Sequence, residues 1–261
     1  MGRIEVGEAK RVVVKVGSSS ISGENSWRIA PLVGALAAAR RRGAEVVLVS
    51  SGAIATGMPF LKLEERPTDL ATQQAAAAVG QSLLVHRYQT ALEPYAIVAG
   101  QVLLTASDME NATHRGNARR AMERLIDLRI LPIVNENDTV ATHEIRFGDN
   151  DRLAALVAEL IDADALVLLS DVDAIYTKPP QFDGAEPIDR VPFGDALDGV
   201  EITATGASGV GSGGAQTKVS AARHAAAAGV AVVVTSIELV GDALGGGLVG
   251  TFFEPAARVR S

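Results

Sequence analysis

Short, almost continuous apolar runs recur along the chain, and most of them are rich in valine and isoleucine. Runs of this length and composition are typical of strands that are buried on both faces of a parallel sheet. We therefore predict strands at residues 11–16, 45–50, 96–104, 131–135, 165–170 and 230–235.

Alanine- and leucine-rich stretches with helical spacing separate these runs. They predict helices at residues 32–42, 70–92, 115–128, 151–161 and 218–228, the first and last closed by Gly43 and Gly229. Strands that alternate with helices predict an α/β fold, a three-layer sandwich with a mainly parallel central sheet covered by helices on both faces. Nearly half of the 261 residues are hydrophobic, which favours a single domain over residues 1–261 with one extensive core.

Two stretches depart from this alternation. Residues 138–147 alternate differently and predict a small hairpin that protrudes before the next helix. Residues 177–214 are rich in proline, glycine and aspartate, which predicts surface excursions and short edge strands rather than a linker between domains.

Charge and composition exclude several classes of function. The formal net charge is −7 and no basic cluster is longer than Arg40-Arg41-Arg42, which argues against a nucleic-acid partner. The absence of cysteine excludes a disulfide scaffold, a thiolate metal site and a cysteine nucleophile. We expect a cytoplasmic protein without a membrane partner, because no apolar run approaches the roughly 20 residues that span a bilayer and no secretory signal opens the chain.

Polar residues collect where four of the predicted strands end. These ends read Lys-Val-Gly-Ser-Ser-Ser from Lys15, Ser-Ser-Gly-Ala from Ser50, Asn-Glu-Asn-Asp from Asn135 and Ser-Asp-Val-Asp from Ser170. Ligands of open α/β sheets bind beyond the carboxyl ends of the strands, so we expect all four ends along one rim that forms the site.

Two of these ends have both a functional and a purely structural interpretation. Lys15 ends a buried strand and must extend its ammonium group toward water or an anion, while Gly17 allows backbone N–H groups to approach a phosphate. Phosphate contact is the interpretation we favour over a capped turn. At Ser51 and Gly52 the alternatives are a ligand-binding turn and a simple helix cap.

Two further segments open helices. The sequence Gly-Asp-Asn-Asp at residues 148–151 holds more polar groups than a cap requires, and it can bind the ammonium and carboxylate groups of an amino acid. The glycine-dense loop at residues 206–218 leads into a helix with Lys218 in its first turn. A lysine there opposes the helix dipole, so a polyphosphate would offset it, although a plain flexible loop is the alternative.

Other common sites are absent from the sequence. There is no Gly-Lys-Ser/Thr of a P-loop, no acidic residue in the place that a dinucleotide fingerprint requires, and no Gly-x-Ser-x-Gly of a hydrolase. The four histidines have no metal-ligand spacing, so we predict no metal ligands among the side chains.

Together these motifs resemble the amino acid kinase family, and within it the members that phosphorylate L-glutamate. The likeness runs from Val12 to about Phe253, and the Asn-Glu-Asn-Asp and Gly-Asp-Asn-Asp pair is specific to those members. The segments that carry it are residues 14–17, 51–55, 78–81 (Ala-Val-Gly-Gln), 100–105, 135–138, 148–151 and 213–218.

The resemblance implies transfer of the γ-phosphoryl group of ATP to the γ-carboxylate of L-glutamate, the first step of proline biosynthesis, with Mg2+ accompanying the nucleotide. Residues of roughly 1–165 would bind the amino acid, and residues of roughly 166–261 would bind ATP. Lys15 and Lys218 would neutralise the transferring phosphoryl group, and Asp151 would orient both lysines. The implied ATP site is Lys15, Gly17, Ser170, Asp171, Ser212, Gly213, Gly214, Ala215, Gln216, Thr217 and Lys218. The implied glutamate site is Ser51, Gly52, Ala53, Asn135, Asp138, Asp149 and Asn150.

The chain departs from the family pattern in a few places. Ser170 and Ser212 stand where threonine is common, and residues 178–180 read Lys-Pro-Pro. We expect a catalytic domain only, without the C-terminal PUA domain that many bacterial members carry. The alternatives are another amino acid kinase such as acetylglutamate kinase, and a non-catalytic amino-acid sensor. Asp138 and Asn150 argue against an acetyl pocket, and the two lysines with Asp151 argue against a sensor. The resemblance alone implies a homodimer or homotetramer and feedback inhibition by proline.

Overall fold

The computed structural model describes residues 4–141, 150–197, 200 and 214–257. Within these ranges the strands are β1 (Arg11–Val16), β2 (Glu45–Ser50), β3 (Ala99–Leu104), β4 (Leu131–Glu136), β5 (Ala165–Ser170), β6 (Arg190–Val191), β7 (Ala231–Ser236) and β8 (Thr251–Phe253). The α-helices are α1 (Ile4–Glu8), α2 (Ile29–Arg41), α3 (Ala53–Gly57), α4 (Leu70–Leu92), α5 (Ala106–Glu110), α6 (Ala112–Asp127), α7 (Asn150–Leu160), α8 (Ala215–Ala227) and α9 (Val240–Leu244). Short 3-10 segments lie at Gly23–Arg28, Met58–Leu61, Glu93–Tyr95 and Ile237–Leu239.

The strands form one sheet with the order β3-β4-β2-β1-β5-β7-β8-β6. Strands β1, β2, β3, β4, β5 and β7 pair in parallel, whereas β8 runs antiparallel to β7 and carries β6 at the edge. Strands β1 and β5 lie at the centre, so the carboxyl ends of β4, β2, β1 and β5 are neighbours along one rim. This rim is where the sequence places its polar motifs.

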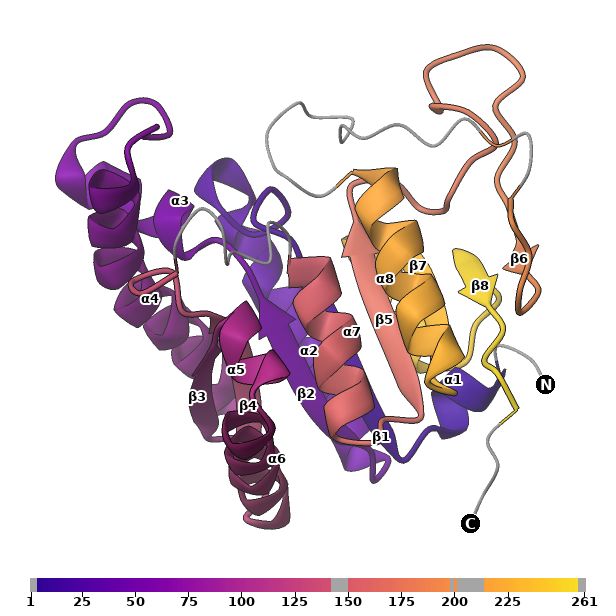
Figure 1. The fold of residues 1–261 in the computed structure, drawn as a ribbon, viewed down its shortest axis with the longest axis horizontal. Coiled ribbons are helices and arrows are strands. Elements are labelled where there is room, and N and C mark those ends of the chain that lie inside the picture. The colour runs from indigo at the N-terminus through magenta and orange to yellow at the C-terminus, as the bar shows by residue number, and fades with distance from the viewer. Residues whose placement is uncertain (1–3, 142–149, 198–199, 201–213, 258–261) are drawn as a thin grey trace.

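Helices cover both faces of the sheet, which confirms the predicted three-layer α/β class. One core lies between the sheet and helices α6, α7 and α8, and it includes Val13 of β1. The other lies between the sheet and helices α2, α4 and α9, and it includes Val12 and Val14. Figure 1 shows α6, α7 and α8 on the near side of the strands. Because side chains alternate along a strand, Lys15 shares the face of Val13.

The long predicted elements agree with the structure, and the differences have local causes. Helix α4 has the predicted ends, and β1, β2 and β5 match their predicted ranges. Strand β3 begins at Ala99 rather than at residue 96, because Ala96 has a φ of 54° and ends a 3-10 segment. The predicted hairpin is described only to Ala141, where the chain turns on a hydrogen bond from Val140 N to Asn137 O. Residues 142–147 of that prediction lie outside the described ranges.

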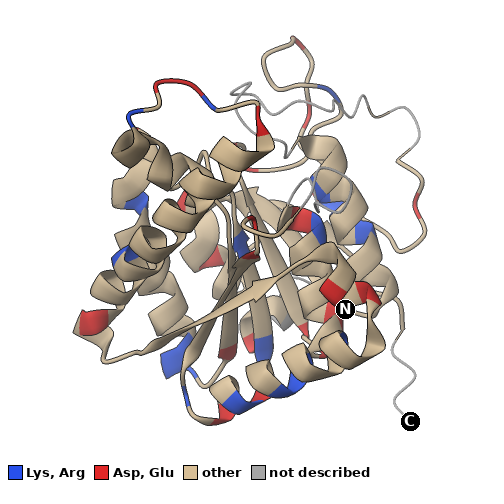
Figure 2. Cartoon of the chain, turned by 60° about the vertical axis from the view of Figure 1, so that its left-hand side comes forward, with Lys and Arg blue, Asp and Glu red and all other residues tan. Residues whose placement is uncertain are grey.

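The predicted excursions at residues 177–214 contain a short edge strand, β6, as expected. Residues 198–199 and 201–213 of that stretch are not described. Among the described residues no helix is both long and apolar enough to cross a membrane. Figure 2 shows basic and acidic residues interspersed along the helices rather than gathered by sign on the face in view.

Candidate active site

Two lysines from distant parts of the chain meet at one buried carboxylate. Lys15 of β1 points to the face that α7 and α8 cover, and its Nζ lies 2.5 Å from Oδ1 of Asp151. Lys218, in the first turn of α8, donates from Nζ to Oδ2 of the same residue at 3.0 Å. Asp151 lies in the first turn of α7, and α7 packs directly on α8. The structure therefore brings together three residues that the sequence analysis assigns to one site.

All three charged groups are buried. Their side chains are 2% (Lys15), 0% (Asp151) and 6% (Lys218) exposed. Removing charges from water is costly, and the carboxylate between the two ammonium groups offsets part of that cost. The three side chains still carry one net positive charge, so an anion placed against them would be strongly favoured in this low-dielectric setting.

The first turn of α8 adds a hydroxyl group to this cluster. Thr217 Oγ1 lies 3.2 Å from Oδ2 of Asp151 and 2.8 Å from the carbonyl oxygen of Gly214. Gly214 is the N-cap residue of α8 and has extended backbone. An acidic group in the first turn of α7 is favourable for that helix, whereas Lys218 opposes the dipole of α8. Asp151 therefore offsets the unfavourable placement of Lys218.

Two glycines keep space open at the rim. A Cβ atom on Gly17 would lie 3.9 Å from Lys15 Nζ, so a side chain there would fill the space beside the ammonium group. Gly52 has a φ of 99°, and a Cβ atom there would lie only 2.9 Å from Ser22 Oγ. Ala53 begins α3 directly after this turn. The turn at Ser51–Ala53 thus depends on glycine for its backbone conformation.

Carboxamide groups from three elements form a connected chain beside Asp151. Asn150 Nδ2 donates to the Ser50 carbonyl oxygen at 2.6 Å and to Oδ1 of Asn135 at 2.8 Å. Asn135 Nδ2 in turn donates to Oε1 of Gln81, on α4, at 2.8 Å. Asn150 and Asn135, predicted to bind the acceptor, are thereby brought together. Asp138 lies half-buried just beyond β4, and Asp149 lies outside the described residues.

Tyr88 of α4 holds the end of β2 through a hydrogen bond with Ser50. Ser50 Oγ and Tyr88 Oη lie 2.8 Å apart, and Tyr88, on α4, is fully buried. Burial raises the pKa of the Tyr88 hydroxyl, and the hydrogen bond with Ser50 offsets only part of that effect. The hydroxyl therefore stays neutral and holds the strand end whose carbonyl receives Asn150.

The predicted nucleotide residues of β5 are tied to the loop after β1. Ser19 Oγ donates to Asp171 at 3.1 Å, and Ser20 Oγ donates to Oδ1 of the same carboxylate at 3.2 Å. Ser170 ends β5 and is half-buried. Ala215 and Gln216 open α8 beside Thr217, with Gln216 exposed. Ser212 and Gly213 lie outside the described residues.

Sequence reasoning assigned no role to several residues that shape this rim. They are Ser19 and Ser20, which clasp Asp171, and Gln81 and Tyr88, which support Asn135 and Ser50. The serines had a signal, since they follow Lys15 at a strand end. Gln81 also had one, since it ends a segment that carries the family resemblance, whereas Tyr88 had only a weak one, its place seven residues later on an alanine-rich helix.

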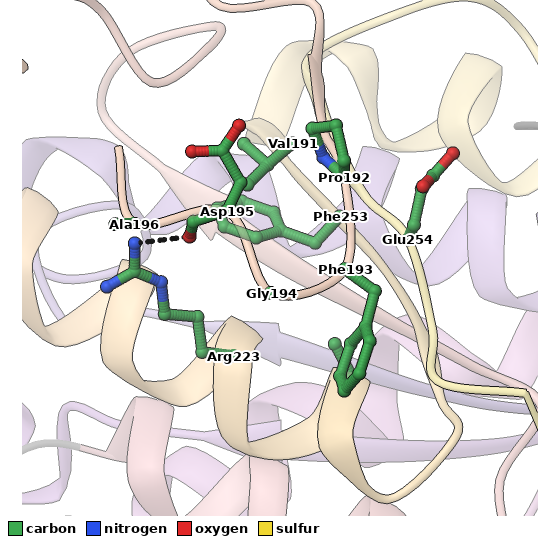
Figure 3. A pocket seen from close by; sticks show the side chains of 10 residues that line it. Val191, Pro192, Phe193, Gly194, Asp195, Ala196, Arg223, Phe253 and Glu254 are labelled. Carbon is green, nitrogen blue, oxygen red and sulfur yellow. Dashed lines mark hydrogen bonds between the residues drawn. The ribbon is translucent and has the colours of Figure 1, made fainter. Parts of the chain in front are cut away.

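A separate pocket of about 310 Å³ lies at the far half of α8. Figure 3 shows it between Phe193, Phe253 and Arg223, whose guanidinium donates to the carbonyl oxygen of Asp195 at 2.8 Å. None of the described predicted site residues lines it. It therefore does not belong to the lysine–aspartate site.

The described residues contain no cluster of three or more histidine, cysteine or acidic side chains that could hold a metal ion. Mg2+ does not need one. It keeps several waters and binds through one or two carboxylates together with substrate phosphates. Carboxylates such as Asp171 at the rim fit that lesser requirement.

Comparison with known proteins agrees with this geometry. Residues 10–236 match the model of the amino acid kinase family. The chain belongs to the amino acid kinase family. It is 72% identical over 254 residues to the glutamate 5-kinase of Leifsonia xyli subsp. xyli, covering 97% of this chain and 94% of that one. The glutamate 5-kinase of Salinispora arenicola is 55% identical over 98% of this chain, which spans 70% of that relative.

Solved structures of distant relatives share the fold. The carbamate kinase of Giardia lamblia bound to AMP-PNP aligns with a TM-score of 0.69 over 96% of this chain and 100% of its own, at 14% identity. The UMP kinase of Bacillus anthracis aligns with a TM-score of 0.65 over 95% of this chain and 97% of its own, at 16% identity. At these identities the likeness establishes the fold alone.

Proposed function

We propose that this protein transfers the γ-phosphoryl group of ATP to the γ-carboxylate of L-glutamate, giving glutamyl 5-phosphate. The observation that carries the proposal is the convergence of Lys15 and Lys218 on the buried Asp151. Relatives that are 72% and 69% identical over 97% of the chain are glutamate 5-kinases, which supports glutamate as the acceptor.

The lysine cluster suits phosphoryl transfer between two anions. A carboxylate that approaches ATP is repelled by the phosphate oxygens, and the reaction asks the protein mainly for in-line positioning and for cations where charge accumulates. Lys15 would hold the side of the phosphoryl group that faces the acceptor, and Lys218 the side that faces the nucleotide. Asp151 would fix the separation and direction of the two ammonium groups, so that no reorganisation is needed during transfer.

The two ligands would occupy different parts of the rim. Residues before about 165 supply the turn at Ser51–Ala53, Asn135, Asp138 and Asn150, and we assign glutamate to them, with Asp149 completing the set. Residues from about 166 supply Ser170, Asp171 and the start of α8, and we assign ATP to them, with Ser212 and Gly213 in the same loop. Mg2+ bound to the phosphates would supply further charge neutralisation.

Other properties follow from the proposed reaction. A biosynthetic kinase that uses ATP and L-glutamate would work in the cytoplasm. We also propose the assembly into dimers or tetramers and the inhibition by proline that the family resemblance implies; size-exclusion chromatography with light scattering and a proline titration test these separately.

A coupled assay of ADP release tests the reaction. Purified protein with ATP and Mg2+ should release ADP with L-glutamate and much less with N-acetylglutamate or UMP, and hydroxylamine should trap the acyl phosphate as a hydroxamate. The variant Lys218→Ala serves as the matched inactive control, which excludes a contaminating kinase. A preference for N-acetylglutamate would refute the substrate assignment, and nucleotide-independent binding without turnover would indicate a sensor.

A further inference from the structure

Buried polar atoms without a hydrogen-bond partner occur on segments that contact the turn after β2 or the helix α3 that follows it. Within the described residues they include Ser22 Oγ, Thr56 Oγ1 and Gln81 Nε2. A Cβ atom on Gly52 would lie 2.9 Å from Ser22 Oγ, and Thr56 donates its backbone N–H to the carbonyl oxygen of Gly52 at 2.9 Å. Gln81 follows Gly80, the residue at which α4 touches α3. The three unpaired groups therefore come from the loop after β1, from α3 and from α4.

The lack of a hydrogen-bond partner at these buried atoms needs a physical explanation. An unpaired buried donor is costly, and native proteins leave few of them. The most direct explanation at a ligand-binding turn is that the acceptor arrives with the ligand. An ionised carboxylate is the best candidate for that acceptor, because it has several acceptor positions and no donor.

Gln81 is the most informative of the three because its other end is already part of the site. Asn135 Oδ1 accepts the backbone N–H of Glu136 at 2.9 Å, which fixes the orientation of that carboxamide. Asn135 Nδ2 must then face Oε1 of Gln81, at 2.8 Å. Gln81 Nε2 is thus the terminal donor of the chain that begins at Asn150.

The place of Gln81 relative to the strands of the sheet indicates which part of the substrate it meets. It contacts the end of β4, and β4 lies two strands away from β1, which carries Lys15. The phosphoryl group is transferred beside Lys15 in the proposed reaction. Gln81 therefore lies on the side of the site that receives the end of the amino acid that does not react.

We propose that Gln81 positions the acceptor, with Nε2 donating a hydrogen bond to the α-carboxylate of L-glutamate while Oε1 holds Asn135. This inference rests on the proposed glutamate kinase function. It adds a residue from α4 to a site otherwise built from strand ends and the first turns of α7 and α8.

Two variants separate donation to the substrate from support of Asn135. Gln81→Met removes both interactions, whereas Gln81→Glu keeps an acceptor for Asn135 and replaces only the donor. Both should raise the KM for L-glutamate at least about tenfold, since hydrogen bonds to charged groups are the strong ones, with kcat and the KM for ATP nearly unchanged. Gln89→Met is the matched control on the same helix, because Gln89 bonds only backbone atoms near β3, at Ile97 and Ala99. It should alter Tm without altering either KM.

The α-amide of L-glutamate gives a readout that a structural defect would not move. Gln81→Glu should shift the ratio of kcat/KM between L-glutamate and its α-amide toward the amide by at least about tenfold, because its carboxylate repels one ligand and accepts from the other. If the α-amide is not phosphorylated, its inhibition constant against L-glutamate is measured in place of its KM. A wild-type KM for glutamate in Gln81→Glu, or an unchanged ratio, would overturn the inference. If the unaltered protein fails to phosphorylate glutamate, the proposed function is wrong, and this inference with it.

Discussion

Replacing Asp151 with asparagine keeps the shape of the side chain and removes the charge that lies between two ammonium groups. In the native site Lys15 Nζ lies 2.5 Å from one carboxylate oxygen and Lys218 Nζ lies 3.0 Å from the other. A carboxamide can accept from one lysine but presents an NH2 group to the other. The variant therefore leaves two buried like charges with at most one shared acceptor.

The size of the effect follows from this geometry. Two ammonium groups bound to one carboxylate are about 5 Å apart, and at an effective dielectric constant near 20 they repel by about 3 kcal/mol. Removing one member of a buried ion pair commonly costs about 3–5 kcal/mol, which corresponds to a fall in Tm of about 10 °C for a domain of this size. The loss of a preorganised electrostatic contact should lower kcat about 100-fold to 1000-fold.

Steady-state kinetics and thermal denaturation of Asp151→Asn test both effects. The KM for ATP should not rise, because the variant site is more positive and attracts the phosphates at least as well. Asp162→Asn is the control, since that carboxylate is 67% exposed and pairs with Arg119 on the surface, where ion pairs contribute little. A kcat within about threefold of the unaltered protein, or an unchanged Tm, would refute the role of Asp151 as the shared counter-ion.

Other substitutions address stability, turnover and pH dependence. Gly80→Ala would place a Cβ atom 1.8 Å from a carbonyl oxygen of α3, so we expect a lower Tm and a higher KM for glutamate. The control is Gly116→Ala, whose Cβ atom would meet only the end of an arginine side chain. This control should neither lower Tm nor raise the KM for glutamate. Lys218→Ala should lower kcat about 100-fold or more with an unaltered circular dichroism spectrum, because it removes a contact to the transferring group. Burial acts to raise the pKa of Glu159, but hydrogen bonds from an arginine of α6 and a histidine of α8 outweigh it and hold the pKa below its ordinary value. That contribution to stability is present above pH 4.5 and is lost as the pH falls through the lowered pKa, so Glu159→Gln should flatten the acid side of a plot of Tm against pH.

The alternating long strands and helices could be predicted from the sequence because each has an apolar pattern over many residues. Apolar runs and the ends of α4 are recognisable without knowledge of their neighbours. The five-residue helices α1, α3, α5 and α9 and the two- and three-residue strands β6 and β8 carry too few residues to show a period. Their positions depend on tertiary contacts, as with Gly57 and Gly80, which bring α3 and α4 together.

The candidate site divides in the same way. Strand ends predicted which residues reach the rim, because parallel strands end on one side of a sheet. The residues alone did not give the partner of each side chain, since Lys15 meets Asp151 only if α7 and α8 cover the same face of β1; the pairing of both lysines with Asp151 was implied by the family resemblance. The contribution of α4 was missed for a related reason: its mixed alanine and polar pattern gives its length clearly but not the direction of Gln81.

The site is therefore held by two sets of elements that can be perturbed separately. Helix α4 supports the proposed acceptor side through Gly80, Gln81 and Tyr88, which contact α3, β4 and β2 in turn. The proposed nucleotide side is held by the loop after β1, whose Ser19 and Ser20 donate hydrogen bonds to Asp171. Changes in α4 should consequently alter the KM for glutamate, whereas loss of the serine clasp, as in Ser19→Ala, should alter the KM for ATP. Asp151 bonds to both lysines, so its replacement should lower kcat without a selective change in either KM.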